Sequence, residues 1–458
     1  MKKLYAWVLA IVALGFLAGC TGNREQLQRF NQIYYSGEQF NQAYAFSKKM
    51  AHKDHSNALL WDLQQGISAL MADRYRQSIR ALDLAELRYD HHHNLFSRSL
   101  GTVGAVLVND NVRAYTGNVY EGVLLNYYKA IDYLLMRDPK DARVEFNRAN
   151  DRQRRAKEFY NKEIRKAVEK MQQQGSNRLS AEQSNSQVQE ILDNEYSNLN
   201  DFYAYNDLIN PVVSYLSGLF FVENSDLSKG LDYLKEAYGI SHSTTIGEDL
   251  LFFQYPSKQR FTWIFIEDGE QATKKEFKIN VPLPLPNGIY DASLALPQLK
   301  DGVDFRSSFS VQVGQRHKKF ENLLLLDALI ASEFKKQLPY ILTRAITSTA
   351  LKVGLEAVSN QYLGVLGGLF SSIYAAASTS ADIRSPALFP HKFYILRINN
   401  NYKQAVHIFA DGQEIFNFRF VSCKASTPPP ESQSFCAHQD HLLYIRSFEN
   451  SGRVWRLW

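Results

Sequence analysis

Three consecutive histidines, His91–His93, are the residues whose type most suggests metal binding. Imidazole nitrogens are common zinc ligands, but neighbouring side chains on a helix point about 100° apart and cannot all reach one ion. No cluster of Cys or Glu accompanies them in the sequence. We therefore expect a solvated helix end here, and we predict no metal site.

Asp382 and Arg384 are a second pair whose spacing suggests chemistry. A carboxylic acid at a junction between a helix and a strand can serve as a general acid, but neither a nucleophile nor a base accompanies this one. We expect the two side chains to form an ion pair or a cap. Because the chain also lacks nucleophile-elbow, zinc-protease and Walker-type motifs, we predict no catalytic residues and no cofactor.

Cys20 indicates where the protein is located. It follows Leu17–Gly19, and before these come two lysines and the apolar run Leu4–Phe16, which is the pattern of a secretory signal peptide. The segment resembles the lipobox of bacterial lipoproteins, whose cysteine receives a diacylglycerol. Thr21 rather than Asp comes next, which points to the outer membrane. We predict a signal peptide over residues 1–19 and a covalent lipid on Cys20; the alternative is an ordinary signal peptide with an accidental cysteine.

The composition is that of a globular protein. The 458 residues are 45% hydrophobic and 22% charged, which predicts two or three domains, and the mild net charge of +5 argues against a nucleic-acid partner. The remaining cysteines are Cys423 and Cys436. In an oxidising compartment we expect them to form a disulfide that contributes about 3 kcal/mol, with two free thiols as the alternative.

Residues 24–245 have a helical pattern, and three stretches of them share one frame. Each set has small residues at its first, second and fourth positions and a larger third residue, with spacings of 12, 4 and 3. Small residues let paired helices approach closely, so the frame resembles the tetratricopeptide pattern. The sets start 64 and 88 residues apart, so long insertions separate them, and an irregular helical bundle is the alternative. The sets are Gly66, Ser78, Leu82 and Ala85; Ala130, Ala142, Phe146 and Ala149; and Gly218, Gly230, Leu234 and Ala237.

Several other segments of the helical part carry their own predictions. Asn31–Met50 fits a degenerate first copy of the frame, and Val103–Val108 is an apolar run expected to fold back onto the helices. Arg143–Lys170 is rich in basic residues, which either meet anionic cell-wall or lipid groups or form the solvated side of a long helix. Gln172–Ser186 is rich in Gln, Ser and Asn and is expected to be a flexible loop.

From about residue 259 the pattern becomes that of β-strands. Pro282–Pro286 contains three prolines and cannot be a central strand, whereas Asp411-Gly412 predicts a hairpin turn. The expected strands are Arg260–Ile266, Phe277–Val281, Ala292–Leu296, Ser308–Val313, Phe393–Ile398, Ala405–Phe409, Glu414–Val421, His441–Phe448 and Arg453–Leu457.

A helical region interrupts these strands. We expect helix from Asn322 to about Tyr374, broken near Pro339, with an apolar second half, Tyr362–Ser378, that is either a buried helix or one inserted into a membrane or partner. The predicted fold class is α+β. A tetratricopeptide-like helical domain would span residues 20–250 and a β-rich domain residues 251–458, with helices at about 322–378.

The chain resembles a family of Gram-negative outer-membrane lipoproteins with tetratricopeptide-like helices and a C-terminal α/β region. Members of that family are often found with lipoproteins similar to activators of peptidoglycan synthases, so the resemblance implies a role in the cell envelope but supplies no catalytic residues. Pro386 departs from the family pattern, which usually has an aromatic residue there. The resemblance is carried by Tyr115–Gly117 with Tyr120-Glu121, the Leu124–Ala149 helix pair, Asn210-Pro211 with Tyr215–Gly218, Ile266–Gly269, Pro282–Pro286, Leu338-Pro339 with Thr343–Ala345, and Ala381–Ser385 with Leu388–Pro390.

These observations favour a lipid-anchored periplasmic scaffold whose helical groove binds a protein partner, with peptidoglycan as another possible ligand. The candidate partner-binding residues are Tyr133, Arg152, Arg155, Tyr215 and Phe221. The first alternative is a structural subunit of an outer-membrane export or surface-appendage complex, in which Tyr362–Ser378 packs into a multimer or the bilayer. A hydrolase acting on peptidoglycan is a third and weaker hypothesis.

Overall fold

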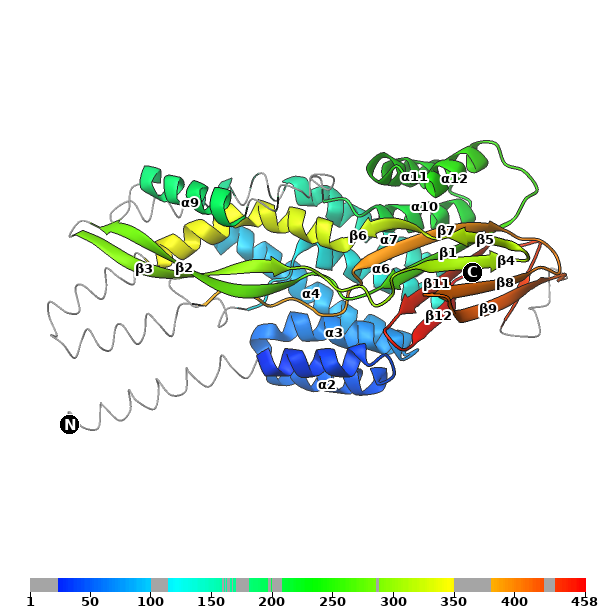
Figure 1. Cartoon of the computed structure of the whole chain (residues 1–458), viewed down its shortest axis with the longest axis horizontal. Coiled ribbons are helices and arrows are strands. Elements are labelled where there is room, and N and C mark those ends of the chain that lie inside the picture. The colour runs from blue at the N-terminus through cyan, green and yellow to red at the C-terminus, as the bar shows by residue number, and fades with distance from the viewer. Residues whose placement is uncertain are drawn as a thin grey trace.

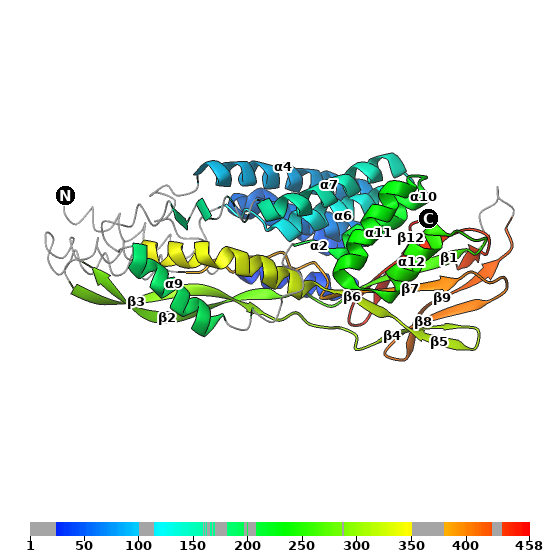
Figure 2. The ribbon, with the colours of Figure 1, turned by 90° about the horizontal axis from the view of Figure 1, so that it is seen from above.

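Strand β1 (Phe261–Asp268) is the central strand of the first sheet, and both of its faces are buried. Successive side chains of a strand point to opposite faces of its sheet. Trp263 and Phe265 pack against helices, whereas Ile264 and Ile266 pack against a second sheet. The molecule therefore has three layers: helices, a first sheet and a second sheet (Figure 2).

The computed structural model describes residues 24–99, 114–158, 181–196, 208–285, 288–349, 380–423 and 433–458, together with residues 160, 162, 165, 166, 168, 169 and 199. Helices come first and sheets occupy the C-terminal half, so the predicted combination of α and β structure is confirmed (Figure 1). Four predictions lie outside the described residues: the signal peptide, Cys20, the Val103–Val108 run and the Tyr362–Ser378 helix.

The helical layer consists mainly of three pairs of consecutive helices, α3–α4, α6–α7 and α10–α11 (Figure 1). An unlabelled helix over residues 24–35 and helix α2 precede them, and α12 follows. Gln172–Ser186 was expected to be a loop, but α9 begins within it. The bounds are α2 Phe40–Lys53, 3-10 helix η1 His55–Asn57, α3 Ala58–Met71, α4 Tyr75–Ser99, α6 Val119–Leu135, α7 Pro139–Glu158, α9 Ala181–Glu195, α10 Pro211–Glu223, α11 Leu227–Ser241 and α12 Thr244–Gln254.

The three helix pairs turn in the same way. In each, the residue seven positions after the first residue of the sequence frame adopts a left-handed conformation: Asp73 (φ 58°), Arg137 (φ 61°) and Ser225 (φ 63°). The next amide then donates to a carbonyl five residues earlier at 2.8 Å, which is the 6→1 hydrogen bond of a Schellman motif. The frame in the sequence therefore corresponds to one repeated helix–turn–helix geometry.

The small residues of the frame mark where paired helices touch. A β-carbon at Gly230 would lie 2.8 Å from the carbonyl oxygen of Gly218 and 2.9 Å from the amide nitrogen of Val222. By contrast, a β-carbon at Gly239, on the exposed side of the same helix, would meet no atom within 4 Å.

Two glycine substitutions in α11 are therefore expected to have opposite effects. Gly230→Ala should lower the free energy of unfolding by about 2 kcal/mol, because α10 and α11 must move apart. Gly239→Ala should raise it by about 0.5–1 kcal/mol through its better helix propensity. Urea unfolding followed by circular dichroism measures both, and equal effects would contradict this account of the α10–α11 contact.

The first sheet has strand order β12-β11-β1-β7-β6 and the second β10-β9-β8-β4-β5. Asp411-Gly412 forms the predicted turn between β8 and β9, which pair antiparallel. Cys423 and Cys436 form a disulfide with an S–S distance of 2.06 Å, next to the parallel pairing of β9 with β10. The bounds are β4 Phe309–Val313, β5 Arg316–Lys319, β6 Glu321–Leu325, β7 Lys392–Asn399, β8 Ala405–Ala410, β9 Gln413–Val421, β10 Ser434–Cys436, β11 His441–Ser447 and β12 Gly452–Arg456.

A two-stranded ribbon, β2 (Thr273–Leu285) and β3 (Gly288–Lys300), extends from the sheets beside a helix over residues 326–349 (Figure 2). Leu294 and Leu296 of the ribbon pack on Phe334 and Leu338 of that helix. Three prolines lie within the ribbon, at the residue pairs Pro282–Asp291, Pro284–Ile289 and Glu276–Pro297. Each strand of this ribbon has one edge that pairs with no other described strand, and proline is tolerated in such edge strands.

Two expectations for this region are wrong. Asn322 begins no helix: it lies in β6, which pairs with β7 and completes the edge of the first sheet. Pro339 does not interrupt the following helix, which continues through residues 326–349. A proline inside a helix removes one hydrogen bond but can be tolerated where packing holds the chain, and Leu338 and Leu342 on either side of it are fully buried.

A buried ion pair lies where the helices meet the first sheet. Glu267 of β1 accepts hydrogen bonds from the hydroxyl groups of Tyr128, at 2.9 Å, and Tyr444. Arg446 of β11 has its Nε 3.9 Å from Glu267 and donates to the carbonyl oxygen of Gly269 at 2.8 Å. Both charged side chains are fully buried, and burial raises the pKa of Glu267. The helical and β parts are therefore joined by one core that contains a charge pair.

Candidate functional site

The residues considered for acid chemistry form an ion pair, whereas the histidines considered for metal binding lie on one helix. His91 and His92 lie on α4 with ring centroids 5.8 Å apart. Asp382 and Arg384 form the expected ion pair at 2.7 Å, and Arg384 also donates to Asn57 at 2.9 Å. The hydrogen bond from Arg384 to Asn57 connects the segment before β7 to the helical layer. Within the described ranges, no group of three or more His, Cys, Asp or Glu side chains is arranged to hold a metal ion.

His391 is the histidine with the most acidic surroundings. Its Nδ1 lies 2.7 Å from Asp304, and its Nε2 lies 3.2 Å from Asp327. Burial opposes its ionisation, but the two carboxylates outweigh this effect and raise the pKa of His391. Because each aspartate faces a different ring nitrogen, the three residues cannot share one ion and instead hold β7 against the start of helix 326–349.

Two of the candidate partner-binding residues are fully buried, so their side chains do not reach the surface in this structure. Tyr215 on α10 is fully buried, lies with its ring 5.3 Å from that of Phe265 of β1 and donates its hydroxyl hydrogen to Asp249. Phe221 is also fully buried, between Phe220 and Tyr233. The reason is tertiary: the first helices of the pairs pack on the first sheet, so the expected groove is filled by the chain itself.

The other three candidates differ in exposure. Tyr133 is half-buried at the end of α6, and Arg155 on α7 is 80% exposed with only a 4.0 Å contact to Asp151. Arg152 is half-buried and pairs with Glu86 at 2.9 Å and Asp90 at 2.7 Å. Only Arg155 is freely available to a partner.

Arg152 belongs to a charge network among α4, α6 and α7. At its centre, the buried Lys129 ammonium lies within 3.0 Å of Asp83, Glu86 and Glu145. Burial opposes the ionisation of Glu86, but hydrogen bonds from Asn126 and Lys129 lower the pKa of Glu86 to about 2. A saturated network of this kind fixes the register of the three helices rather than offering a reactive group.

A groove of about 440 Å³ opens between α7 and α11, the second helices of their pairs. Arg154 lies over the ring of Tyr233 with 5.3 Å between its guanidinium carbon and the ring centroid, and Lys229 lies over Phe221 at 4.7 Å. The walls are therefore polar and carry charges of both signs, and the buried Tyr233 ring lies beneath Arg154. The lining residues are Asn147, Asp151, Arg154, Lys229, Asp232 and Tyr233.

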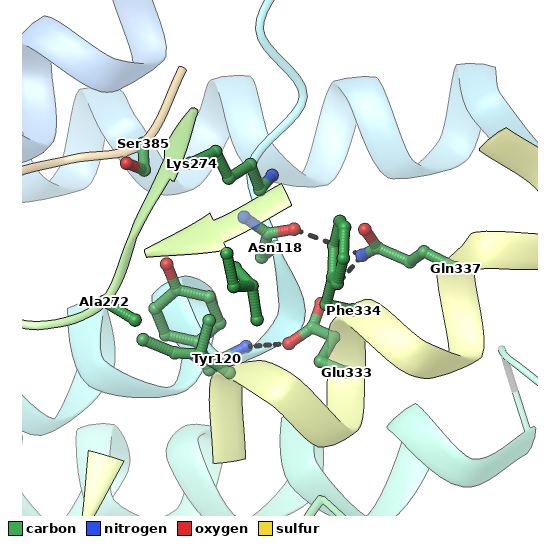
Figure 3. A pocket seen from close by; sticks show the side chains of 10 residues that line it. Asn118, Tyr120, Ala272, Lys274, Glu333, Phe334, Gln337 and Ser385 are labelled. Atoms are coloured by element: carbon green, nitrogen blue, oxygen red, sulfur yellow. Dashed lines mark hydrogen bonds between the residues drawn. The ribbon is translucent and has the colours of Figure 1, made fainter. Parts of the chain in front are cut away.

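A second, narrow pocket lies where the start of α6, the ribbon and helix 326–349 meet (Figure 3). Glu333 accepts hydrogen bonds from the backbone amides of Val119, at 2.7 Å, and Tyr120, at 3.0 Å. Tyr160 and Gln337 also donate to this carboxylate. Because the first amides of a helix have no partner within it, Glu333 acts as a cap supplied from another helix.

Glu121 is a second buried carboxylate near this pocket. Its Oε1 accepts hydrogen bonds from Tyr115 and Asn118, each at 2.6 Å, while Oε2 is buried without a hydrogen-bond partner among the described residues. Burial raises the pKa of Glu121 to about 7, and the negative charge of Glu333 adds to this effect. A carboxyl group with such a pKa can exchange a proton near neutral pH.

The pocket is nevertheless too small for a substrate. Its free space is about 10 Å³, close to the least that one water molecule requires. Lys274 and Ser385 close it from the ribbon and the segment before β7 (Figure 3). The arrangement joins three segments, and the raised pKa of Glu121 makes the stability of the protein depend on pH.

Glu121→Gln is expected to change how stability depends on pH. Because the pKa of Glu121 in the folded protein is about 7, above its ordinary value, the folded state keeps a proton that the unfolded chain has lost. The resulting stability is present at low pH and disappears as the pH rises through 7. Between pH 5 and 8 the wild type should lose about 2 kcal/mol more than the variant.

Urea unfolding at several pH values measures this difference, with the exposed Glu38→Gln as the control. Parallel pH profiles for the wild type and Glu121→Gln would contradict the assignment.

Glu333 was not among the residues predicted from the sequence, and Glu121 was named there only for the family resemblance. Asn118 and Glu121 have the three-residue spacing of a capping box, a signal that marks the start of α6. Glu333 carries no comparable signal because its backbone partners are more than 200 residues away.

No protein-family model matches the chain, and no curated protein matches it either.

Proposed function

We propose that the protein is a lipid-anchored scaffold of the bacterial cell envelope that binds a protein partner through the groove between α7 and α11. The groove is the observation that carries this proposal, because it is open and presents cations and carboxylates from both helices. The lipobox-like segment ending at Cys20 supports an outer-membrane location facing the periplasm. The repeated Schellman turns support a tetratricopeptide-like origin of the helix pairs.

The proposed binding surface differs from the one usual for helical repeats. Such proteins commonly use the inner, concave face, which the first helices line. Here Tyr127 and Tyr128 of α6 and Tyr215 of α10 are buried with the first sheet in one core. The partner would therefore bind the second helices of the pairs, which leaves the sheets available for other contacts.

Crosslinking in intact envelopes followed by affinity purification tests this proposal. The double variant Arg154→Glu/Lys229→Glu reverses both groove cations, whereas Arg76→Glu/Arg80→Glu makes the same charge change on the exposed side of α4. We expect a specific protein to be recovered with the wild type and the control but not with the groove variant. Recovery of no specific protein, or equal recovery with all three, would count against the groove.

The alternative of a structural subunit rests on Tyr362–Ser378, which lies outside the described residues. Among the helices that the structure describes, none is long and apolar enough to cross a bilayer. No specific observation therefore favours this alternative over the scaffold.

A further inference from the structure

Strand β5 forms one free edge of the second sheet. It pairs only with β4 among the described strands, and its four residues, Arg316–Lys319, are all exposed (Figure 2). The amide of Phe320 donates to the carbonyl of Phe309 at 3.2 Å, so even-numbered residues direct their backbone groups toward β4. His317 and Lys319 therefore present their N–H and C=O groups at the open edge.

This edge is strongly cationic. Arg316, Lys318 and Lys319 have no carboxylate within 4.0 Å in the part of the chain that the structure describes, and the β4 residues opposite them are uncharged. Lys403 adds a further cation nearby, since the Gly314 amide of the β4–β5 turn donates to the carbonyl of Ala405 at 3.3 Å. Tyr402, next to Lys403, is 55% exposed.

Charge on an edge strand commonly prevents two identical edges from pairing. The same lysines that would repel a second copy of β5 complement an acidic strand, so repulsion and attraction together select one kind of partner. The open N–H and C=O groups of β5 can pair only with a backbone that is itself extended. They therefore restrict the conformation of the partner as well as its charge.

We propose that β5 is a docking edge for an extended acidic peptide segment of another protein, which adds to the second sheet as a further strand. The main chain of the segment would pair with His317 and Lys319, and its acidic side chains would lie beside Arg316 and Lys318 on one face of the sheet or beside Lys319 on the other. This site is separate from the groove between α7 and α11 and does not depend on the proposed scaffold function.

Fluorescence anisotropy with labelled eight-residue peptides tests the proposal on the full chain. The probes are a peptide that alternates Glu and Thr, the same peptide with N-methylated backbone amides, and one that alternates Lys and Thr. We expect the first to bind, and the other two to bind at least tenfold more weakly. Lys318→Glu/Lys319→Glu should reduce binding by about tenfold or more, whereas Lys48→Glu/Lys49→Glu on exposed α2 should not.

Hydrogen exchange supplies the second measurement, because strand addition should slow exchange of the His317 and Lys319 amides. Absence of binding, or equal binding of the N-methylated peptide, would overturn the proposal. So would binding of the chain to phosphatidylglycerol vesicles through Lys318 and Lys319 without binding of the Glu–Thr peptide, since the edge would then be a site for anionic lipid.

Discussion

Arg446→Met is expected to lower the free energy of unfolding by about 3–5 kcal/mol, because it leaves the buried Glu267 without its cation. The substitution also removes the hydrogen bond to the carbonyl of Gly269. The pKa of Glu267 is already raised by burial, and loss of the guanidinium should raise it further. A raised carboxyl pKa costs stability as the pH increases, so the loss should grow from pH 5 to pH 8.

Denaturant unfolding at both pH values checks this expectation. Arg419→Met, on the exposed face of β9, is the matched control and should change stability by less than about 0.5 kcal/mol. Adding Glu267→Gln to Arg446→Met should recover part of the loss by removing the uncompensated charge. Equal effects of the Arg446 and Arg419 substitutions would show that the buried pair does not stabilise the helix–sheet contact.

Glu333→Ala should cost about 3 kcal/mol, because the amides of Val119 and Tyr120 lose their acceptor inside the protein. Glu333→Gln should cost less, because one of its side-chain atoms can still accept a hydrogen bond. In both variants the first turn of α6 should open more often, so the Val119 and Tyr120 amides should exchange faster with deuterium.

The control for this prediction is Glu190→Ala, an exposed glutamate on α9, which should leave exchange at α6 unchanged. Faster exchange throughout the chain, without a local effect at the start of α6, would indicate general destabilisation and contradict the role of Glu333 as a cap. The two predictions concern different contacts. Arg446 and Glu267 lie where the helices meet the first sheet, and Glu333 connects α6 to helix 326–349.

The contacts around Glu267 show that the inner side of the helical layer packs against the chain's own first sheet. Tyr128 and Tyr444, from opposite parts of the chain, donate to the same carboxylate of Glu267. Side chains that were expected to face a partner, such as Tyr215, face the chain's own sheet instead. Any partner of this protein must therefore bind surfaces other than the inner side of the helix pairs.

Local patterns were sufficient for several predictions. The frame beginning at Gly66, Ala130 and Gly218 predicted three helix pairs because the close approach of helices depends on residues near in sequence. Asp411-Gly412 predicted the β8–β9 turn because few residues adopt its backbone angles. Proline at Pro282 and Pro284 correctly excluded a central strand, since β2 belongs to a two-stranded ribbon.

Other predictions failed because they depended on distant contacts. Asn322 has helical neighbours in the sequence, but pairing with β7 makes it part of a strand. Pro339 normally disrupts a helix, yet the buried residues around it keep the chain helical.

The sequence by itself determined the class and order of the elements: helix pairs first, strands later, and a cysteine pair near the end of the chain. Those features follow from periodicity, turn residues and residue type, which act over a few positions. Only the tertiary structure decided that the sheets cover the inner face of the helices and that Glu333 caps α6. It also decided that a cationic strand lies at an open edge. Each of these depends on groups far apart in the sequence, whose contacts arise from burying apolar faces together rather than from any local signal.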